Sequence, residues 1–334
     1  MPRAVKALYA LLVVLLLAAP APAITASARD DTDQAPTVRA ARPARPADRI
    51  APAPAPTTPP TPRMPGVRGL EIGVPAYVWA NDRMLNGLTA TGPAASIVVL
   101  NPGNGDSPFD AAWQARADAL RGGTTSTGEK TKVLGYVHTD HGNRDIEAVK
   151  VSVDNYLKPS DGGGGRLHVD GIFFDVVSRE CGPGNATRDH YAELRRYVQD
   201  TMNTIDPAAN DLVVDNPGTA IDDCYLEPGH RTADIFVTYE DTYAAYTAGG
   251  WLGGNVFDHA TGYRAGSELD PSGTAFWHLI HDVPDADAMR TALRTAFERG
   301  AGYAYATSTV MPNPWNAGPT WAYRAETEYA ATLG

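Results

Sequence analysis

A regular alternation of short apolar runs with helical segments is the feature that most constrains how this chain can fold. The runs are continuous rather than alternating and are rich in β-branched and aromatic residues, which is typical of parallel strands buried on both faces. We predict eight strands, at Glu71–Trp79, Ser96–Asn101, Lys132–Thr139, Val169–Val177, Asp211–Asn216, Ala233–Glu240, Thr274–His281 and Gly302–Thr309.

Helical patterns lie between many of these runs. We predict four helices, at Asp110–Arg121, Asp145–Leu157, Arg188–Asn203 and Asp285–Arg299. In the last of them apolar residues recur at helical spacing and Asp285 is suited to cap the N-terminus. Eight strands with interspersed helices predict an α/β fold, a (β/α)8 TIM barrel that forms a single catalytic domain over residues 66–334. A doubly wound open sheet is the alternative, and it is less favoured because no glycine-rich phosphate loop follows the first strand.

The N-terminal residues differ from the rest. Arg3 and Lys6 precede an apolar run from Leu8 to Ala19, and small residues follow it. This run is short for a bilayer span, so we predict a cleaved signal peptide over residues 1–23 and a secreted protein without an integral membrane anchor. Residues 24–65 are rich in Pro, Ala and Thr and lack aromatics, which predicts a disordered linker.

The net charge of the chain is −11, and it is unevenly distributed. Residues 1–65 hold eight basic and four acidic side chains, and residues 66–334 hold 20 basic and 35 acidic ones. No basic stripe indicates nucleic-acid binding. The acidic domain favours either plain solubility or attraction of a cationic substrate.

Only two cysteines are present, Cys181 and Cys224, which excludes a cysteine-rich zinc module. Both follow predicted strands, in loops that contain Gly, Pro and Asp. In an exported protein we expect them to form one disulfide that joins two neighbouring loops. Two free thiols are the alternative.

Active sites of TIM barrels lie at the C-terminal ends of the strands, so polar residues there are the candidate functional residues. They are Asn101, His138, Asp140, Asp175, Asp215, Asn216, Glu240, Asp241, His278, His281, Asn313 and Trp315. Aromatic residues gather in the same segments, and Tyr77, Trp79 and Trp315 are candidates for stacking on sugar rings, although aromatics are equally common in cores.

Two carboxylates carry the best chemical hypothesis. Asp175 and Glu240 each end an apolar run that should be buried. Burial and a second nearby carboxylate raise a carboxyl pKa, and such a pair can divide acid and base or nucleophile roles in glycoside hydrolysis. A structural role, such as capping a helix, is the alternative for each.

Other chemistries fit less well. The chain has neither a Gly-x-Ser-x-Gly elbow nor a His-Glu-x-x-His motif. The segment His138-Thr139-Asp140-His141, together with His278 and His281, could supply ligands to the metal of a polysaccharide deacetylase. We consider hydrogen bonding to substrate the better interpretation of these histidines, and we expect no metal and no cofactor.

A series of segments resembles the spherulin-4 (spherulation-specific) family over residues 70–325. The matching segments are Val74–Trp79, Ser96–Pro102, Val133–Thr139, Val169–Asp175, Asn216–Thr219, Ala233–Glu240, Phe276–His281, Glu298–Gly300 and Pro312–Trp315, in this order.

The resemblance implies a (β/α)8 fold and endo-acting glycoside hydrolase activity, of the endo-α-N-acetylgalactosaminidase type, on exopolysaccharide containing N-acetylgalactosamine and galactosamine. It maps the functional carboxylates onto Asp175 and Glu240. The family typically has Asp-Glu where this chain has Asp175-Val176, and commonly Gly where it has Asp215. We therefore consider that Asp215 places a substitute carboxylate at the rim.

The leading hypothesis is a secreted, monomeric glycosidase that acts on a polysaccharide substrate. The first alternative is a non-catalytic glycan-binding or cell-envelope protein on the same barrel, motivated by Val176. The second is the metal-dependent deacetylase or hydrolase.

Overall fold

The computed structural model describes residues 69–158, 169–227, 229–248 and 274–334. The predicted signal peptide (1–23) and linker (24–65) lie outside the described residues. None of the helices that the structure describes is long and apolar enough to cross a membrane.

Eight parallel strands form a closed barrel in which each strand pairs with its neighbours in chain order and β1 pairs with β8. The strands are β1 (Glu71–Ala76), β2 (Ile97–Leu100), β3 (Lys132–His138), β4 (Gly171–Asp175), β5 (Leu212–Asn216), β6 (Ile235–Thr242), β7 (Ala275–His281) and β8 (Tyr303–Ala306). The predicted TIM barrel and its eight strands are confirmed, with ends that differ by up to three residues.

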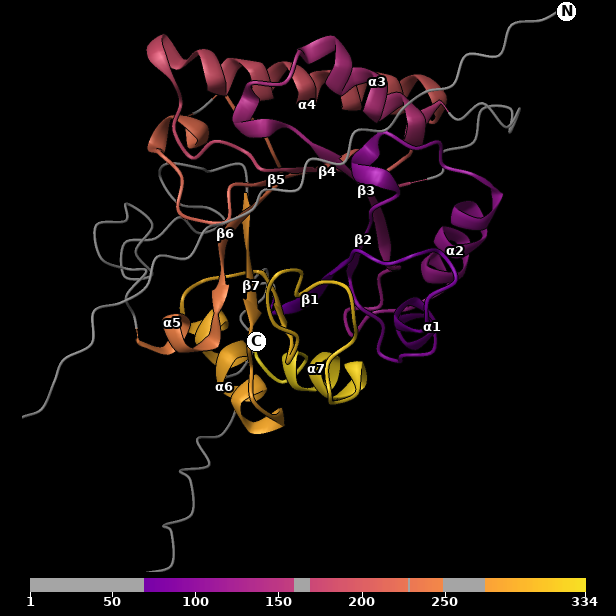
Figure 1. Cartoon of the computed structure of the whole chain (residues 1–334), viewed down its shortest axis with the longest axis vertical. Helices are drawn as coiled ribbons and strands as arrows, with labels where there is room; N and C mark the ends of the chain where they lie inside the picture. The colour runs from indigo at the N-terminus through magenta and orange to yellow at the C-terminus, as the bar shows by residue number, and fades with distance from the viewer. Residues whose placement is uncertain (1–68, 159–168, 228, 249–273) are drawn as a thin grey trace, which may run out of the picture. The chain divides into compact units, whose positions relative to one another are not determined.

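Within the described residues, seven α-helices lie around the strands (Figure 1). They are α1 (Arg83–Thr89), α2 (Ala111–Arg121), α3 (Ile146–Leu157), α4 (Ala186–Ile205), α5 (Tyr243–Ala248), α6 (Ala286–Glu298) and α7 (Tyr323–Ala330). The four predicted helices correspond to α2, α3, α4 and α6. The predicted N-cap is confirmed, since Asp285 accepts hydrogen bonds from the N–H groups of Asp287 and Ala288. The helices α1, α5 and α7 are six to eight residues long and were not predicted, because so few turns give little periodic pattern.

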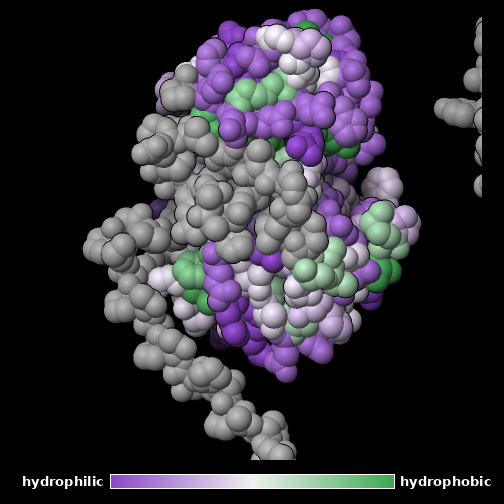
Figure 2. All heavy atoms as spheres, turned by 90° about the vertical axis from the view of Figure 1, so that its left-hand side faces the viewer, coloured by the Kyte–Doolittle hydropathy of each residue, from purple (hydrophilic) through white to green (hydrophobic). Residues whose placement is uncertain are grey.

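The core has two layers, as the continuous apolar strands predict. One fills the barrel, where Trp277 of β7 lies 5.8 Å from Phe173 of β4, ring centre to ring centre. Gly73 of β1 leaves room for the Trp277 ring, since a Cβ there would come within 2.6 Å of it. The other layer packs strands against helices, for example where Tyr156 of α3 lies over Gly135. The surface in Figure 2 is mostly hydrophilic over the described residues, with small hydrophobic areas between.

Candidate active site

The contact between Phe173 and Trp277 defines which side chains face the inside of the barrel. Side chains alternate along a strand, and residues paired in register between parallel strands share a face. Phe173 pairs with Tyr136 and Val214, which places Asp175, His138 and Asn216 on the same inner face two residues further on. The inner face therefore presents a ring of polar side chains at the C-terminal ends of the strands.

Glu240 reaches this ring through an irregularity in β6. Val237 pairs with the inward-facing Trp277, but Tyr239 pairs with His278, so Thr238 is an extra residue in the ladder. Without this bulge, Tyr239 would face inward and Glu240 outward. With it, Tyr239 packs outside against Tyr246 and Glu240 faces the barrel interior.

One amide nitrogen joins the two carboxylates. Asn216 Nδ2 donates to Asp175 Oδ1 at 2.7 Å and to Glu240 Oε2 at 2.8 Å. The orientation of this amide is fixed because Asn216 Oδ1 accepts a hydrogen bond from the Gly218 N–H. The bonded oxygens of Asp175 and Glu240 therefore lie within about 5.5 Å of each other, a spacing at which the charge of one carboxylate raises the pKa of the other.

Each carboxylate also accepts a hydrogen bond from an aromatic side chain. The Tyr136 hydroxyl donates to Asp175 Oδ2 at 2.6 Å, and Trp315 Nε1 donates to Glu240 Oε1 at 2.9 Å. Trp315 also contacts His281, with ring centres 6.1 Å apart. Every oxygen of the pair is thus held by a side chain on another strand or loop.

Burial is the main influence on the protonation of the pair. It raises the pKa of Glu240 to about 7, and the Asp175 charge adds to this effect, while hydrogen bonds from Asn216 and Trp315 oppose it. Burial also raises the pKa of Asp175. Hydrogen bonds from Tyr136, Val176 and Asn216 oppose this rise, because they favour the ionised carboxylate. One member of the pair is therefore protonated near neutral pH.

A cleft of about 540 Å³ opens beside Tyr136, the donor to Asp175. Its lining residues are Tyr77, Val78, Trp79, Asp82, Asn101, Gly103, Asn104, Tyr136, Asn313 and Asn316. Tyr136 connects the cleft to Asp175, and Trp79, which is 79% exposed, lies at its outer part. The cleft combines aromatic rings with amide groups, which suits a ligand that has both apolar faces and many hydroxyls.

The model of the spherulation-specific family 4 matches residues 71–326. The chain belongs to this family. The comparison with curated proteins found no match.

Among solved structures, Aspergillus clavatus Sph3 in complex with GalNAc is similar with a TM-score of 0.61 and 22% identity, over 79% of this chain and 98% of that one. The glycoside hydrolase domain of PgaB (BpsB) from Bordetella bronchiseptica has a TM-score of 0.41 and 11% identity, over 71% of this chain and 93% of that one. The likeness to Sph3 shows the fold.

The structure of this spherulation-specific family 4 member brings most predicted site residues together. Asp175, Glu240, Asn216 and Trp315 are joined by hydrogen bonds, and Tyr77, Trp79, Asn101 and Asn313 line the cleft. His138 pairs in register with Asp175, and His281 contacts Trp315. Asp140 lies beyond β3 in the short 3-10 helix Asp140–Gly142, where it is exposed.

Three candidate residues face away from the site. Asp241 of β6 is exposed on the outer face. Asp215 is fully buried on the outer face of β5, where Thr232 Oγ1 donates to its carboxylate at 2.8 Å. The prediction that Asp215 supplies a carboxylate at the rim is therefore wrong. His278 is also fully buried on the outer face, where Nδ1 lies 2.7 Å from the Tyr246 hydroxyl, and burial lowers its pKa to about 3. It does not reach the cleft.

Val176 directly follows Asp175, and its side chain carries no group that can exchange a proton. The role of Tyr136 as donor to Asp175 and the cleft residues Asp82, Asn104 and Asn316 were not predicted. Tyr136 lies two residues before His138, the polar end of β3. That spacing puts both side chains on one face of the strand, and it is the signal from which Tyr136 could have been predicted.

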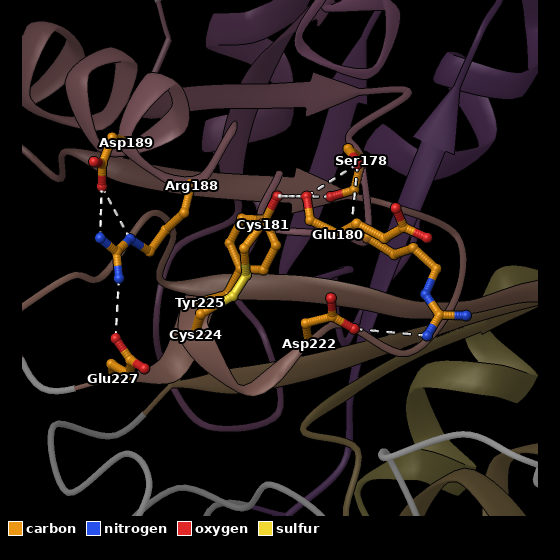
Figure 3. Close-up of a disulfide and its surroundings, with 10 residues drawn as sticks. Ser178, Glu180, Cys181, Arg188, Asp189, Asp222, Cys224, Tyr225 and Glu227 are labelled. Carbon is orange, nitrogen blue, oxygen red and sulfur yellow. Dashed lines mark hydrogen bonds and ion pairs between the residues drawn. A yellow bond between two sulfur atoms is a disulfide. The ribbon is translucent and has the colours of Figure 1, made fainter. Parts of the chain in front are cut away.

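The loop after β4 is held by the predicted disulfide, which is confirmed between Cys181 and Cys224, with Cα atoms 6.5 Å apart. It joins this loop to the 3-10 helix Asp223–Leu226 (Figure 3). In the same region the Tyr225 hydroxyl donates to the carbonyl of Ser178, and Arg188 lies between Asp189 and Glu227 (Figure 3). The chain that follows Asp175 is therefore fixed to the β5–β6 connection.

Proposed function

We propose that this protein is a secreted glycoside hydrolase that cleaves within exopolysaccharide containing N-acetylgalactosamine and galactosamine. The observation that carries the proposal is the pair Asp175 and Glu240, bridged by Asn216 at the inner rim of the barrel. Two neighbouring, half-buried carboxyl groups, one protonated and one ionised, are the equipment that glycoside hydrolysis needs.

The surroundings of each carboxyl group assign its role. Asp175 accepts hydrogen bonds from Tyr136 and Asn216, and the Val176 N–H also favours the ionised form of its carboxyl group. We therefore assign Asp175 the ionised form and the role of nucleophile. Glu240, with its pKa near 7, holds the proton and acts as general acid. The Asp175 oxygen bonds to the anomeric carbon while Glu240 protonates the leaving glycosidic oxygen. Glu240 then takes a proton from water, which attacks the same carbon and releases Asp175.

The short separation of the two groups favours this double displacement. Carboxyl groups about 5–5.5 Å apart are typical of retaining enzymes, whereas inverting enzymes need about 6.5–9.5 Å to admit a water molecule. With both oxygens bonded to one nitrogen, Asp175 and Glu240 fit the shorter spacing. We therefore propose net retention at the anomeric carbon.

The cleft supports a polymeric sugar as the substrate. Trp79 offers an exposed ring on which a sugar face can stack, and the amides of Asn101 and Asn313 offer donors to its oxygens. The Oδ1 atoms of both amides accept from the backbone N–H groups of Asn104 and Trp315. Asn101 Nδ2 also donates to Asn104 Oδ1 at 3.4 Å, which leaves its second hydrogen and the Asn313 Nδ2 group to donate to a ligand. The excess of acidic residues over residues 66–334 would attract a partly deacetylated, cationic polymer.

The experiment is incubation of the purified full chain with such a polymer, followed by mass spectrometry of the soluble products. We expect oligosaccharides from the wild type and none from Glu240→Gln or Asp175→Asn. Asp241→Asn is the matched control, because Asp241 is exposed beside Glu240 and should leave the products unchanged. Products that persist in Glu240→Gln would remove Glu240 from the mechanism.

Val176 favours a second candidate, a non-catalytic glycan-binding protein. Retention on the polymer without release of products, weakened by Trp79→Ala, would support it.

The metal-dependent deacetylase is not favoured, because His278 faces away from His138 and the described residues contain no group of three or more His, Cys, Asp or Glu that could hold a metal ion. Secretion is proposed from the N-terminal sequence together with the disulfide.

A further inference from the structure

The turn that follows Asp175 holds a strained residue. Val176 has φ of +55°, in the left-handed region. Among the described residues the other non-glycine positions with positive φ are Asn, Asp or His, which tolerate this region, whereas Val176 is β-branched. The conformation is strained for a β-branched residue and persists only where the surroundings enforce it.

Thr139, at the end of β3, makes the contacts that enforce it. Its backbone N–H donates to the Asp175 carbonyl at 3.0 Å. Its Oγ1 lies 2.9 Å from the Asp175 carbonyl and 3.0 Å from the Val176 carbonyl. The Val176 carbonyl also accepts from the His141 N–H at 2.6 Å. Both peptide groups around Val176 are thus bonded to the β3–α3 connection.

Tyr191 of α4 sets the direction of the Thr139 hydroxyl. The Tyr191 hydroxyl lies 2.9 Å from Thr139 Oγ1, and Thr139 is fully buried between the strand end and this helix. Carbonyl oxygens only accept, so the Thr139 hydrogen points to the carbonyls of the turn and Tyr191 donates to Oγ1. The contact with Tyr191 therefore orients the Thr139 hydroxyl toward the turn at Val176.

The turn matters because it carries Asp175. The Val176 N–H is a donor to the Asp175 carboxylate and favours its ionised form. A Val176 residue that relaxed to negative φ would redirect this N–H and the Asp175 Cα–Cβ bond, while Tyr136 and Asn216 would stay in place. The carboxylate would then lose the geometry of its hydrogen bonds.

We propose that Thr139 is a positioning residue for Asp175, whose hydroxyl holds Val176 in the left-handed conformation and so orients the carboxylate for attack. This proposal rests on the proposed function for its effect on hydrolysis. Thr139 itself is buried behind the strand and does not touch the substrate.

The first test compares Thr139→Val, which loses the hydroxyl at nearly constant volume, with Thr139→Ser, which keeps it. We expect kcat of Thr139→Val to fall about 10-fold or more with KM within about 2-fold, and Thr139→Ser to keep kcat within about 3-fold. Thr131→Val is the matched control, because Thr131 directly precedes the same strand, is buried and donates to the Ala95 carbonyl. A kcat loss in Thr131→Val as large as that in Thr139→Val would overturn the proposal.

The second test uses relief of the strain. Glycine adopts positive φ at no steric cost, so Val176→Gly should hold the turn without help from Thr139. We expect the kcat loss caused by Thr139→Val to be at least about 3-fold smaller in the Val176→Gly background. An equal loss in both backgrounds would mean that Thr139 acts on something other than the turn.

A third measurement does not depend on hydrolysis. The carboxyl of Asp175 is followed by ¹³C NMR during a pH titration of aspartate-labelled full chain, and Asp175→Asn identifies its signal. We expect the apparent pKa of Asp175 to rise in Thr139→Val and to stay unchanged in Thr139→Ser and Thr131→Val. An unchanged titration in Thr139→Val would overturn the proposal. A wild type that cleaves no polymer but shows this shift would refute the proposed function and retain the positioning role.

Discussion

Asp175 and Glu240 lie on β4 and β6, and the strand between them supplies the single nitrogen, Asn216 Nδ2, that both carboxylates accept from. This nitrogen lowers the repulsion between two buried acids by bringing a positive partial charge between them. It also fixes their separation. The chemistry that we propose therefore depends on Asn216 as well as on the two acids.

Replacement of Asn216 by Ala should therefore shift the pH dependence of kcat. Asn216 favours the ionised forms of both carboxyl groups, so its loss should raise the pKa of each and move the whole bell-shaped profile to higher pH. We expect kcat at the optimum to fall by about 10- to 100-fold. Asn203→Ala, on the exposed surface of α4, is the control and should change neither. An unmoved profile would show that Asn216 does not tune the pair.

Trp315→Phe should move only one side of the profile. Trp315 Nε1 donates to Glu240, and this bond lowers the Glu240 pKa, so its removal should raise that pKa above its value of about 7. Activity requires protonated Glu240, so the loss of activity at high pH should occur at higher pH. Trp321→Phe is a matched control, because Trp321 Nε1 donates to Glu326 instead. Identical alkaline limbs for Trp315→Phe and the wild type would exclude this bond from the tuning of Glu240.

The sequence was sufficient to predict the strands and the two carboxylates. The strands of a TIM barrel are buried on both faces, so they read as apolar runs whose polar ends mark the rim. Because the strands are buried on both faces, the sequence does not show whether a polar residue faces the barrel interior or the helices. Asp215 and His278 end or interrupt apolar runs as Asp175 does, yet both face the helices. Both strands are apolar on their inner and outer faces, so no alternation distinguishes inside from outside.

The bulge at Thr238 shows a second limit. Counting two residues at a time from Val237 places Tyr239 inside the barrel and Glu240 outside, and the structure has the reverse. The extra residue is set by how β6 pairs with β7, which local sequence does not express. Glu240 was predicted from its place after an apolar run and from the family resemblance. Its inward orientation could not be predicted from spacing.

Removal of the disulfide should destabilise the barrel. Cys181 and Cys224 are separated by 43 residues, and closing a loop of that length restricts the unfolded chain enough to contribute about 4 kcal/mol in the chain-entropy model. The double variant Cys181→Ala/Cys224→Ala should therefore unfold at lower urea concentration than the wild type. Reducing agent should lower the midpoint of the wild type and leave the double variant unchanged. Equal midpoints for oxidised wild type and double variant would contradict a stabilising role.

Glu326 should make stability fall as pH rises. It is fully buried in α7, and burial raises its pKa from 4.5 to about 8, against a hydrogen bond from Trp321. The folded chain therefore binds more protons than the unfolded chain between these values, so the destabilisation is absent below about pH 4.5 and complete above about pH 8. Urea unfolding of the wild type should show a loss on the order of 3 kcal/mol between pH 5 and pH 8 from this group. Glu326→Gln should remove most of that loss, whereas Glu328→Gln, exposed on the same helix, should preserve it. If the free energy of unfolding depended on pH equally in Glu326→Gln and Glu328→Gln, Glu326 would not be the source of that dependence.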